Sequence, residues 1–438
     1  MTLINEIENK LCEIPVIDIH THVDAGHLSA RGLYDVLLYH MIVSELYTSG
    51  CPSGSRLSED PQEEEREERI IEALPYLENI QNTSCFWGVR IILKDLYEWD
   101  KPVTHENWRY IDGIIREKSK DKNWSREILG RAKIEKVSTE LWRRKDGSAD
   151  DVLKYSLEWA FFTRTQWKQY DTALLELENA WSQEMPGAPL PVTLKTGVLK
   201  HKKKITTLDD VNNAINYYCK HIPFEEIFSV AQHFSTDINY RLVDDKEMEA
   251  ALRKREFASE LERDIYANYI LEAFLCRLEQ VNRDFVYLFS CGAEPLPYET
   301  GSKLRSDTLF QLAGIFQRHP GIKFQAFLAN AAQNQALCSL VRELPNLSVA
   351  GFWWHNFFPS SIGRIIDERL DMLPLNKQIG FFSDAYCVEW SYAKLQIIRK
   401  QFAGILAHKV EQQQYDLNNA LSIAKKILYD TPASFLKI

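Results

Sequence analysis

Short apolar runs alternate with longer amphipathic stretches along most of this 438-residue chain. The first run, at residues 15–19, has the β-branched content and the length of a buried strand. Seven later runs share these properties, at residues 136–141, 159–164, 227–234, 284–292, 322–329, 347–354 and 379–384. Eight strands alternating with helices predict an α/β fold, a parallel (β/α)8 barrel of the TIM type with its site at the carboxyl ends of the strands.

Other stretches complete the predicted organisation. Residues 31–50 are apolar at near-helical spacing and predict a helix that stops at Gly50. Residues 51–130 are acidic and aromatic and show helical patterns without a convincing strand, so we interpret them as an inserted helical region. We place one barrel-shaped catalytic domain in residues 1–50 and 131–438, because barrels with insertions can reach this length. A ninth strand-like run, at residues 189–197, is assigned to a connection.

Composition narrows the class of protein. Apolar residues make up 45% of the chain and aromatic residues 12%, which is enough for a large core. The chain has 52 Lys and Arg against 62 Asp and Glu, so its net charge is −10. This charge argues against a nucleic-acid-binding surface. The locally basic run at residues 200–204 is interpreted as a solvated loop.

The sequence also bears on location and on the state of the thiols. No apolar run has the length that a membrane span requires, and the first 15 residues mix acids and bases where a signal peptide would be apolar. We therefore expect a cytoplasmic protein without membrane contact, and we expect it to form a homo-oligomer. Its eight cysteines are scattered without a C-x-x-C pair, so we expect mostly buried thiols and no disulfide framework.

Polar residues end the first and the last predicted strands. His20 and His22 follow the first apolar run, and Asp384 ends the last one. Alternation along the strand predicts that Asp18, His20 and His22 share one face. Strands 1 and 8 are neighbours in a closed barrel, so the two imidazoles and the Asp384 carboxylate should converge there.

Two neutral histidines and one carboxylate, with a position left open, are typical of a catalytic divalent-metal site. Zinc fits this ligand set best, and manganese, iron or cobalt suit the same ligands. An H-x-H pair alone is a weak motif that also occurs as structural or surface histidines. The position of both histidines at a strand end, together with Asp384 at another, favours the metal.

Four motifs, in their order along the chain, resemble the uronate isomerase family of the amidohydrolase superfamily. They are PVIDIHTHV at residues 15–23, LYDVLLYHMIVSEL at 33–46, GFWWHN at 351–356 and FFSDAY at 381–386. The resemblance implies a distorted (β/α)8 barrel in which His20, His22 and Asp384 hold one zinc ion. It also implies an aldose–ketose isomerase that acts on a hexuronate.

The resemblance assigns further positions near the sugar. His40 matches the histidine of the family's Asp-His-Tyr or Tyr-His-Tyr run, although Met41 stands where that run ends in Tyr. Arg164 matches the strand 3 arginine that grips the substrate, His233 lies where many members have an Asp-His pair, and Trp354 would line the pocket. Taken alone, His40 also fits a hydrogen-bonded core histidine, Arg164 a structural ion pair and Trp354 a core aromatic residue.

The sequence departs from the family just after the last strand. The family continues as Ser-Asp-x-Arg, and that arginine helps to bind the hexuronate carboxylate; here Tyr386 stands at that place. A phenol offers one neutral donor where a guanidinium offers a bidentate clamp. We therefore place Tyr386 at the substrate and leave the identity of the sugar acid open.

These observations favour a metal-dependent aldose–ketose isomerase for a hexuronate or a related sugar acid. Asp384 or His40 would move the proton between adjacent carbons, and Arg164 would hold the carboxylate of the substrate. A zinc-dependent hydrolase is an alternative, because the same barrel supports both chemistries, and His233 is the extra strand-end histidine it would use. A sugar-acid-binding protein without turnover is a further alternative, supported by Tyr386.

Overall fold

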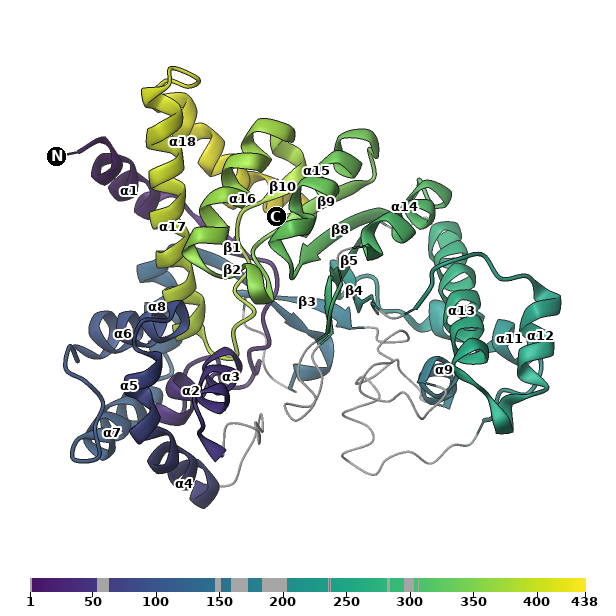
Figure 1. The fold of residues 1–438 in the computed structure, drawn as a ribbon, viewed down its shortest axis with the longest axis horizontal. Coiled ribbons are helices and arrows are strands. Elements are labelled where there is room, and N and C mark those ends of the chain that lie inside the picture. Colours follow the sequence, from purple (N-terminus) through teal and green to yellow (C-terminus); the bar gives the residue numbers. More distant parts are fainter. Residues whose placement is uncertain are drawn as a thin grey trace.

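The computed structural model describes residues 2–52, 63–145, 151–158, 172–182, 203–234, 236, 238–281, 284–294, 303–305 and 307–438. Within these residues, eight parallel strands form one curled sheet in chain order (Figure 1). The strands are β1 (Val16–Asp18), β2 (Ile134–Glu140), β3 (Leu153–Glu158), β4 (Ser229–His233), β5 (Val286–Cys291), β8 (Lys323–Leu328), β9 (Leu347–Ala350) and β10 (Gln378–Ile379). The two-residue strands β6 (Ala293–Glu294) and β7 (Lys303–Leu304) form a separate antiparallel pair. The predicted α/β fold with eight parallel strands is confirmed.

The two ends of the sheet meet through loops. Within the described residues no strand ladder joins β10 to β1. The segments that follow these strands are instead joined by two backbone hydrogen bonds. Asp384 N donates to His20 O at 3.0 Å, and His22 N donates to Ala385 O at 2.8 Å. The curled sheet therefore brings the segments after its first and last strands together.

Helices cover the outside of the sheet. Between β1 and β2 lie α2 (Leu33–Leu37), α3 (His40–Thr48), α4 (Glu63–Ala73), α5 (Leu77–Ile80), α6 (Ser84–Tyr97), α7 (Trp108–Ser119) and α8 (Trp124–Ala132), after an N-terminal α1 (Leu3–Glu13). Later come α9 (Thr172–Ser182), α11 (Leu208–His221), α12 (Asp245–Leu252), α13 (Glu260–Val281), α14 (Thr308–Arg318), α15 (Asn334–Glu343), α16 (Pro359–Met372), α17 (Val388–Glu411), α18 (Leu417–Lys425) and α19 (Thr431–Leu436). In Figure 1, α2–α8 lie with α17 on one side of the sheet, and α9–α13 lie on the opposite side.

Strand β5 is apolar on both faces, as expected for a parallel strand that is buried on both sides. In β5, Val286 and Leu288 belong to the cluster inside the curl, whereas Tyr287 and Phe289 pack against the outer helices. A separate outer cluster joins β1 and β2 to α1–α8 and α17. The last helix, α19, adds Ala433 and Leu436 to the inner cluster, so the C-terminal segment fills one end of the curl.

Three predicted elements differ from the structure. The third strand is Leu153–Glu158, whose buried positions include a serine, so it lacks the apolar run that marks the other strands. The predicted strand at residues 159–164 and the run at 189–197 lie outside the described residues. The predicted strands at 347–354 and 379–384 end early, at Ala350 and Ile379. The remaining residues of these two segments form the loops that carry polar side chains.

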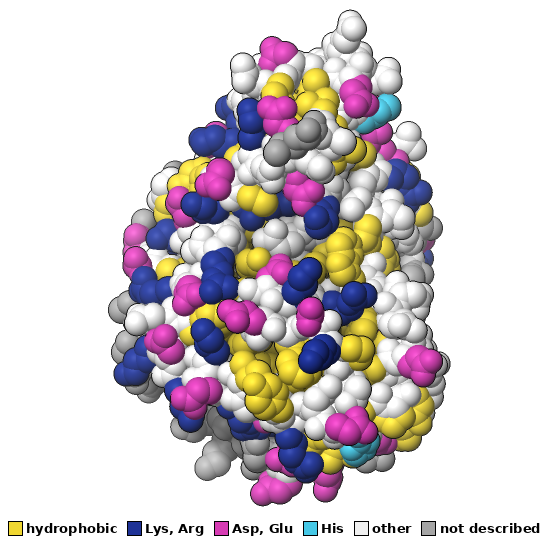
Figure 2. Space-filling model, turned by 90° about the vertical axis from the view of Figure 1, so that its left-hand side faces the viewer, with side chains coloured by type: hydrophobic (Ala, Val, Ile, Leu, Met, Phe, Trp, Pro, Cys, Tyr) yellow, Lys and Arg dark blue, Asp and Glu magenta, His cyan; other side chains and the backbone are white. Residues whose placement is uncertain are grey.

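The described helices and the face drawn in Figure 2 show how apolar and charged residues are distributed. Of the described helices, none is long and apolar enough to cross a membrane. On the face in Figure 2, basic and acidic side chains are interspersed, with hydrophobic groups between them.

Candidate metal centre

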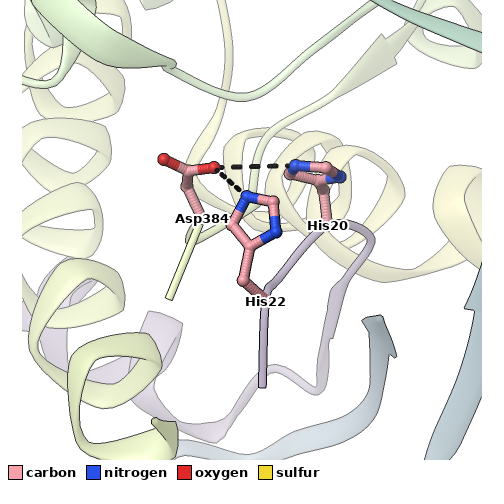
Figure 3. Close-up of side chains that lie close together, drawn as sticks. All are labelled: His20, His22 and Asp384. Atoms are coloured by element: carbon pink, nitrogen blue, oxygen red, sulfur yellow. Dashed lines mark hydrogen bonds and ion pairs between the residues drawn. The ribbon is translucent and has the colours of Figure 1, made fainter. Parts of the chain in front are cut away.

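His20, His22 and Asp384 converge at the carboxyl ends of the strands (Figure 3). Nε2 of His22 lies 3.2 Å from Asp384 Oδ1, and Nε2 of His20 lies 3.6 Å from the same oxygen. One ligand atom from each residue lies within 4.8 Å of the others. Two imidazoles and a carboxylate at this spacing are a donor set that fits a divalent cation.

The histidines reach this point because β1 ends at Asp18. Ile17 and Ile19 belong to the inner cluster. The centroid of the His20 ring lies 5.2 Å from that of Phe327 and 5.7 Å from that of Phe382, and both phenylalanines belong to the same cluster. Asp18 instead accepts a hydrogen bond from Ser383 N at 2.8 Å and is not part of the ligand group. Asp18 thus holds the segment after the last strand, and the two histidines that follow β1 carry the candidate ligand atoms.

His40 approaches Asp384 from the other side. The predicted single helix at residues 31–50 is broken into α2 and α3, and the extended backbone of Tyr39 forms the break. His40 is consequently the first residue of α3, and its Nε2 lies 3.4 Å from Asp384 Oδ2. The two oxygens of Asp384 thus face different groups, Oδ1 toward His20 and His22, and Oδ2 toward His40.

The backbone at the site adopts a conformation that L-residues avoid. Asp384 has φ 56° and Trp354 has φ 52°, both in the left-handed region. Gly351 has φ 51°, and a Cβ at this position would meet a ring atom of Phe382 at 1.9 Å. Non-glycine residues in this region are held by their surroundings and cluster at functional sites.

A buried pair stands behind Asp384 and holds its backbone. The Tyr39 hydroxyl donates to Asp384 O at 2.9 Å, and Lys394 Nζ of α17 donates to the Tyr39 oxygen at 2.8 Å. Burial lowers the pKa of Lys394 and raises that of Tyr39 well above its usual value. These contacts fix the unusual Asp384 conformation from outside the sheet.

Glu140, the last residue of β2, supports His22. Its carboxylate forms a short contact with His22 Nδ1 and accepts a hydrogen bond from Arg143 Nε at 2.7 Å. Burial acts to raise the pKa of Glu140, but His22 and Arg143 together hold it well below its usual range. Glu140 is therefore an anion at neutral pH.

The surroundings shift the pKa values of the titratable groups in the site in different directions. Burial acts to raise the pKa of Asp384, but hydrogen bonds from His20, His22 and His40 hold it well below its usual value. Burial acts to lower the pKa of His22, but Glu140 and Asp384 raise it well above its usual value. The pKa of His40 is lowered, mainly by burial. The site thus contains a carboxylate and, in His40, an imidazole that is neutral at neutral pH.

Aromatic rings form the walls beside these groups. The Trp354 ring is stacked on that of His40, with centroids 5.8 Å apart. The Tyr386 ring lies 5.0 Å from the His22 ring and 5.5 Å from that of His40. The guanidinium carbon of Arg143 lies 5.8 Å from the Tyr386 centroid. The structure thus brings together Trp354 and Tyr386, both singled out from the sequence, with an arginine that was not.

Of the two other residues singled out from the sequence for the substrate, the structure describes His233 only. His233, at the end of β4, has its Nδ1 2.6 Å from Ser290 Oγ and its ring 5.7 Å from that of Trp353. It does not join the metal-ligand group of the described residues. Arg164 lies outside the described residues.

Sequence reasoning missed Glu140, Arg143, Tyr39 and Lys394. For Glu140 a signal was present, because it is a polar residue at the end of a predicted strand, as His20 and Asp384 are. No local pattern marks Lys394, which lies in a long helix and donates a hydrogen bond to Tyr39.

A second group of possible ligands lies elsewhere, on α13 and at the end of α14. Glu272, Cys276 and His319 place one donor atom each within 4.8 Å of one another. The guanidinium of Arg318, however, holds Glu272 through two hydrogen bonds of 2.9 and 2.8 Å. A cation there would compete with that bidentate ion pair, so the donor set is satisfied without a metal.

Comparison with known proteins yields fold similarity alone. No family model and no curated protein matches the sequence. The uronate isomerase of Thermotoga maritima has a similar fold, with a TM-score of 0.78 and 15% identity over 99% of this chain and 97% of that one. The glucuronate isomerase of Caulobacter crescentus gives 0.75 and 14% identity over 99% and 94%. A proposed metal-dependent hydrolase of Lactobacillus casei gives 0.54 and 12% identity over 98% and 97%.

Proposed function

We propose that this protein is a metal-dependent aldose–ketose isomerase that acts on a hexuronate or a closely related sugar acid. The observation that carries the proposal is the meeting of His20, His22 and Asp384 at the carboxyl edge of the sheet. The shared fold with uronate and glucuronate isomerases over 99% of the chain supports the same choice.

The proposal includes the organisation of the chain. The curled sheet would act as a TIM-type barrel, formed by residues 1–50 and 131–438, with residues 51–130 as an inserted helical region. We expect the protein to act as a homo-oligomer in the cytoplasm. Arg164 would hold the carboxylate of the substrate, as the sequence resemblance implies.

His20, His22 and Asp384 would hold one divalent ion, and zinc suits two imidazoles and one carboxylate best. When bound, the ion would supply Lewis acidity for the negative charge that develops on the sugar oxygens during proton transfer. The raised pKa of His22 fits this assignment, because a cation would take the place of the proton that its carboxylate neighbours favour.

The side chains of the protein would carry the proton between C2 and C1. Asp384 Oδ2 and His40 Nε2 lie 3.4 Å apart, so a proton can be shared between them. Burial lowers the pKa of His40, which keeps its imidazole neutral and able to accept a proton at neutral pH. Trp354 and Tyr386 would exclude water from the reacting carbons and orient the sugar.

The test combines metal content with two reaction readouts. Purified protein is reconstituted with zinc or manganese and mixed with glucuronate, galacturonate and other sugar acids. Ketose formation and deuterium uptake at C2 are then followed. Asp384→Asn is expected to lower both by at least about 100-fold, the range of acid–base catalysis by one group. Asp284→Asn is the matched control, since Asp284 is exposed beside Lys323 and outside the site.

Bound metal without ketose formation or exchange on any hexuronate would overturn the isomerase assignment. Similarity to the Lactobacillus casei protein would then favour metal-assisted hydrolysis, which the same protein tests by release of products from esters, lactones and amides. Saturable binding of a uronate without either reaction would identify a sugar-acid-binding protein.

A further inference from the structure

Glu140 lies in contact with His22, one of the candidate metal ligands. In Figure 3 one ring nitrogen of His22 points to Asp384, and the other points away from it. That second nitrogen, Nδ1, contacts the Glu140 carboxylate. The exposed fraction of the Glu140 residue is 2%, so water does not compete for this contact.

Backbone and hydroxyl contacts fix the alignment of the two residues. Thr21 N and Thr21 Oγ1 both donate to Ser138 O, at 2.8 and 2.7 Å. Thr139 Oγ1 donates to Val23 O at 2.9 Å. The segment after β1 therefore runs beside the end of β2, and this alignment places His22 opposite Glu140.

A third group fixes the carboxylate itself. Arg143 Nε donates to the second Glu140 oxygen at 2.7 Å, and the Arg143 side chain is 12% exposed. Each oxygen of Glu140 thus has its own partner, His22 on one and Arg143 on the other. A carboxylate held in this way cannot rotate without breaking a charge-assisted hydrogen bond.

We propose that Glu140 is a positioning residue that sets the tautomer and the orientation of His22 for metal binding. A proton on Nδ1 is donated to Glu140, and this leaves the Nε2 lone pair directed toward the point shared with His20 and Asp384. The inference rests on the proposed metal site and adds a residue outside the ligand set. Through Arg143, the same carboxylate links the metal ligand to the wall formed by Tyr386.

Glu140→Gln tests the inference through metal affinity. The amide keeps the shape of the side chain but loses the charge, and the dissociation constant for zinc is expected to rise by about 10- to 100-fold. Affinity is measured by chelator competition on metal-free protein, with no need for turnover. Glu135→Gln is the matched control, because Glu135 lies exposed at the other end of β2 and accepts from Tyr429.

Two further readouts separate positioning from a structural role. Cobalt-substituted Glu140→Gln should show an altered d–d spectrum, whereas the unfolding free energy of its metal-free form reports the stability of the fold. Should Glu140→Gln fail to fold, Glu140→Asp and Arg143→Met provide the test. Glu140→Asp withdraws the carboxylate from both His22 and Arg143, whereas Arg143→Met removes the partner of one oxygen only. Each variant is expected to weaken zinc binding by several-fold.

Unchanged zinc affinity and an unchanged cobalt spectrum in the folded Glu140 and Arg143 variants would overturn the inference. This result differs from failure of the proposed metal site, in which the wild-type protein itself would bind no divalent metal, and from failure of the isomerase assignment, in which the wild-type protein would bind metal without turnover. Wild-type binding together with weakened binding in Glu140→Gln, but not in Glu135→Gln, would support it.

Discussion

The sheet is held together in two different ways. Between β5 and β8, a regular parallel ladder pairs Val286 with Lys323 at one end and Cys291 with Leu328 at the other. We call this ladder, together with Phe289 and the three rings around it (Phe234, Phe316 and Phe324), the apolar wall. Between β1 and β10, no ladder forms within the described residues, and residues 18–24 and 383–387 meet through polar contacts. We call these two segments the polar seam.

The difference shows how one sheet separates stability from chemistry. At the apolar wall, Phe289 is buried between Phe234, Phe316 and Phe324, with ring centroids 4.9 to 6.5 Å away. At the polar seam the strands stop early, so the backbone can turn and Asp384 can adopt its left-handed conformation. Buried hydrogen bonds replace the missing ladder there, and the same segments carry the candidate metal ligands.

The largest effect on stability is expected from the apolar wall. Phe289→Ala should lower the free energy of unfolding by about 3–5 kcal/mol, because it removes a buried ring and leaves a cavity. Urea denaturation measures the loss. Phe310→Ala is the control, since that ring is 65% exposed on α14 and its removal should change stability by less than about 0.5 kcal/mol. Equal losses would contradict the role given to the apolar wall.

Metal binding should act on the polar seam alone. At a free metal concentration about 100 times the dissociation constant, the ion is expected to stabilise the protein by about 2.7 kcal/mol. Thermal and urea unfolding with metal and with chelator measure this increment. Phe289→Ala should keep the increment, and Asp384→Asn should lose it. Persistence of the increment in Asp384→Asn would place the metal elsewhere.

A smaller loss is expected from the contacts behind Asp384. Tyr39→Phe removes the hydroxyl between Lys394 Nζ and Asp384 O, and the loss should be about 1–2 kcal/mol because two buried partners are left unsatisfied. Urea denaturation of the metal-free protein measures it. Tyr110→Phe is the control, since Tyr110 is exposed on α7. A Tyr39→Phe variant as stable as the wild type would show that Asp384 is held by other contacts.

The last prediction concerns the pH dependence of stability and rests on Glu176, a buried acidic residue of α9. Neither carboxylate oxygen hydrogen-bonds within the described part of the chain, and burial raises its pKa well above the usual value. The folded state therefore keeps a proton that the unfolded chain loses above about pH 4.3. The contribution of Glu176 to the free energy of unfolding is therefore fully present below that pH. It is lost as the pH rises through the folded-state pKa of Glu176.

Glu176→Gln should remove this part of the pH dependence, because the amide cannot ionise. Urea denaturation at a series of pH values from 4 to 9 compares the two proteins, and the variant should gain relative to the wild type as the pH rises. Glu178→Gln is not a suitable control, since Glu178 holds Arg255. Glu256→Gln serves instead, because Glu256 is exposed in the 3-10 helix Arg255–Phe257 before α13. Parallel pH profiles for wild type and Glu176→Gln would contradict the assignment.

The sequence determined most of the strands and the three candidate metal ligands. Apolar runs fixed seven of the strands to within a few residues, because strand periodicity is a local property. His20, His22 and Asp384 could be selected because parallel strands end at one edge of the sheet. Where the pattern was mixed, as in Leu153–Glu158, the strand was missed.

The tertiary structure decided which side chains surround those ligands. The break between α2 and α3 brings His40 to Asp384, and the alignment of β1 with β2 sets Glu140 against His22. Lys394 reaches the site from a helix 355 residues beyond Tyr39 in the chain. Such contacts depend on strand register and on helix packing, and hydrophobic periodicity carries no information about either beyond the face that is buried.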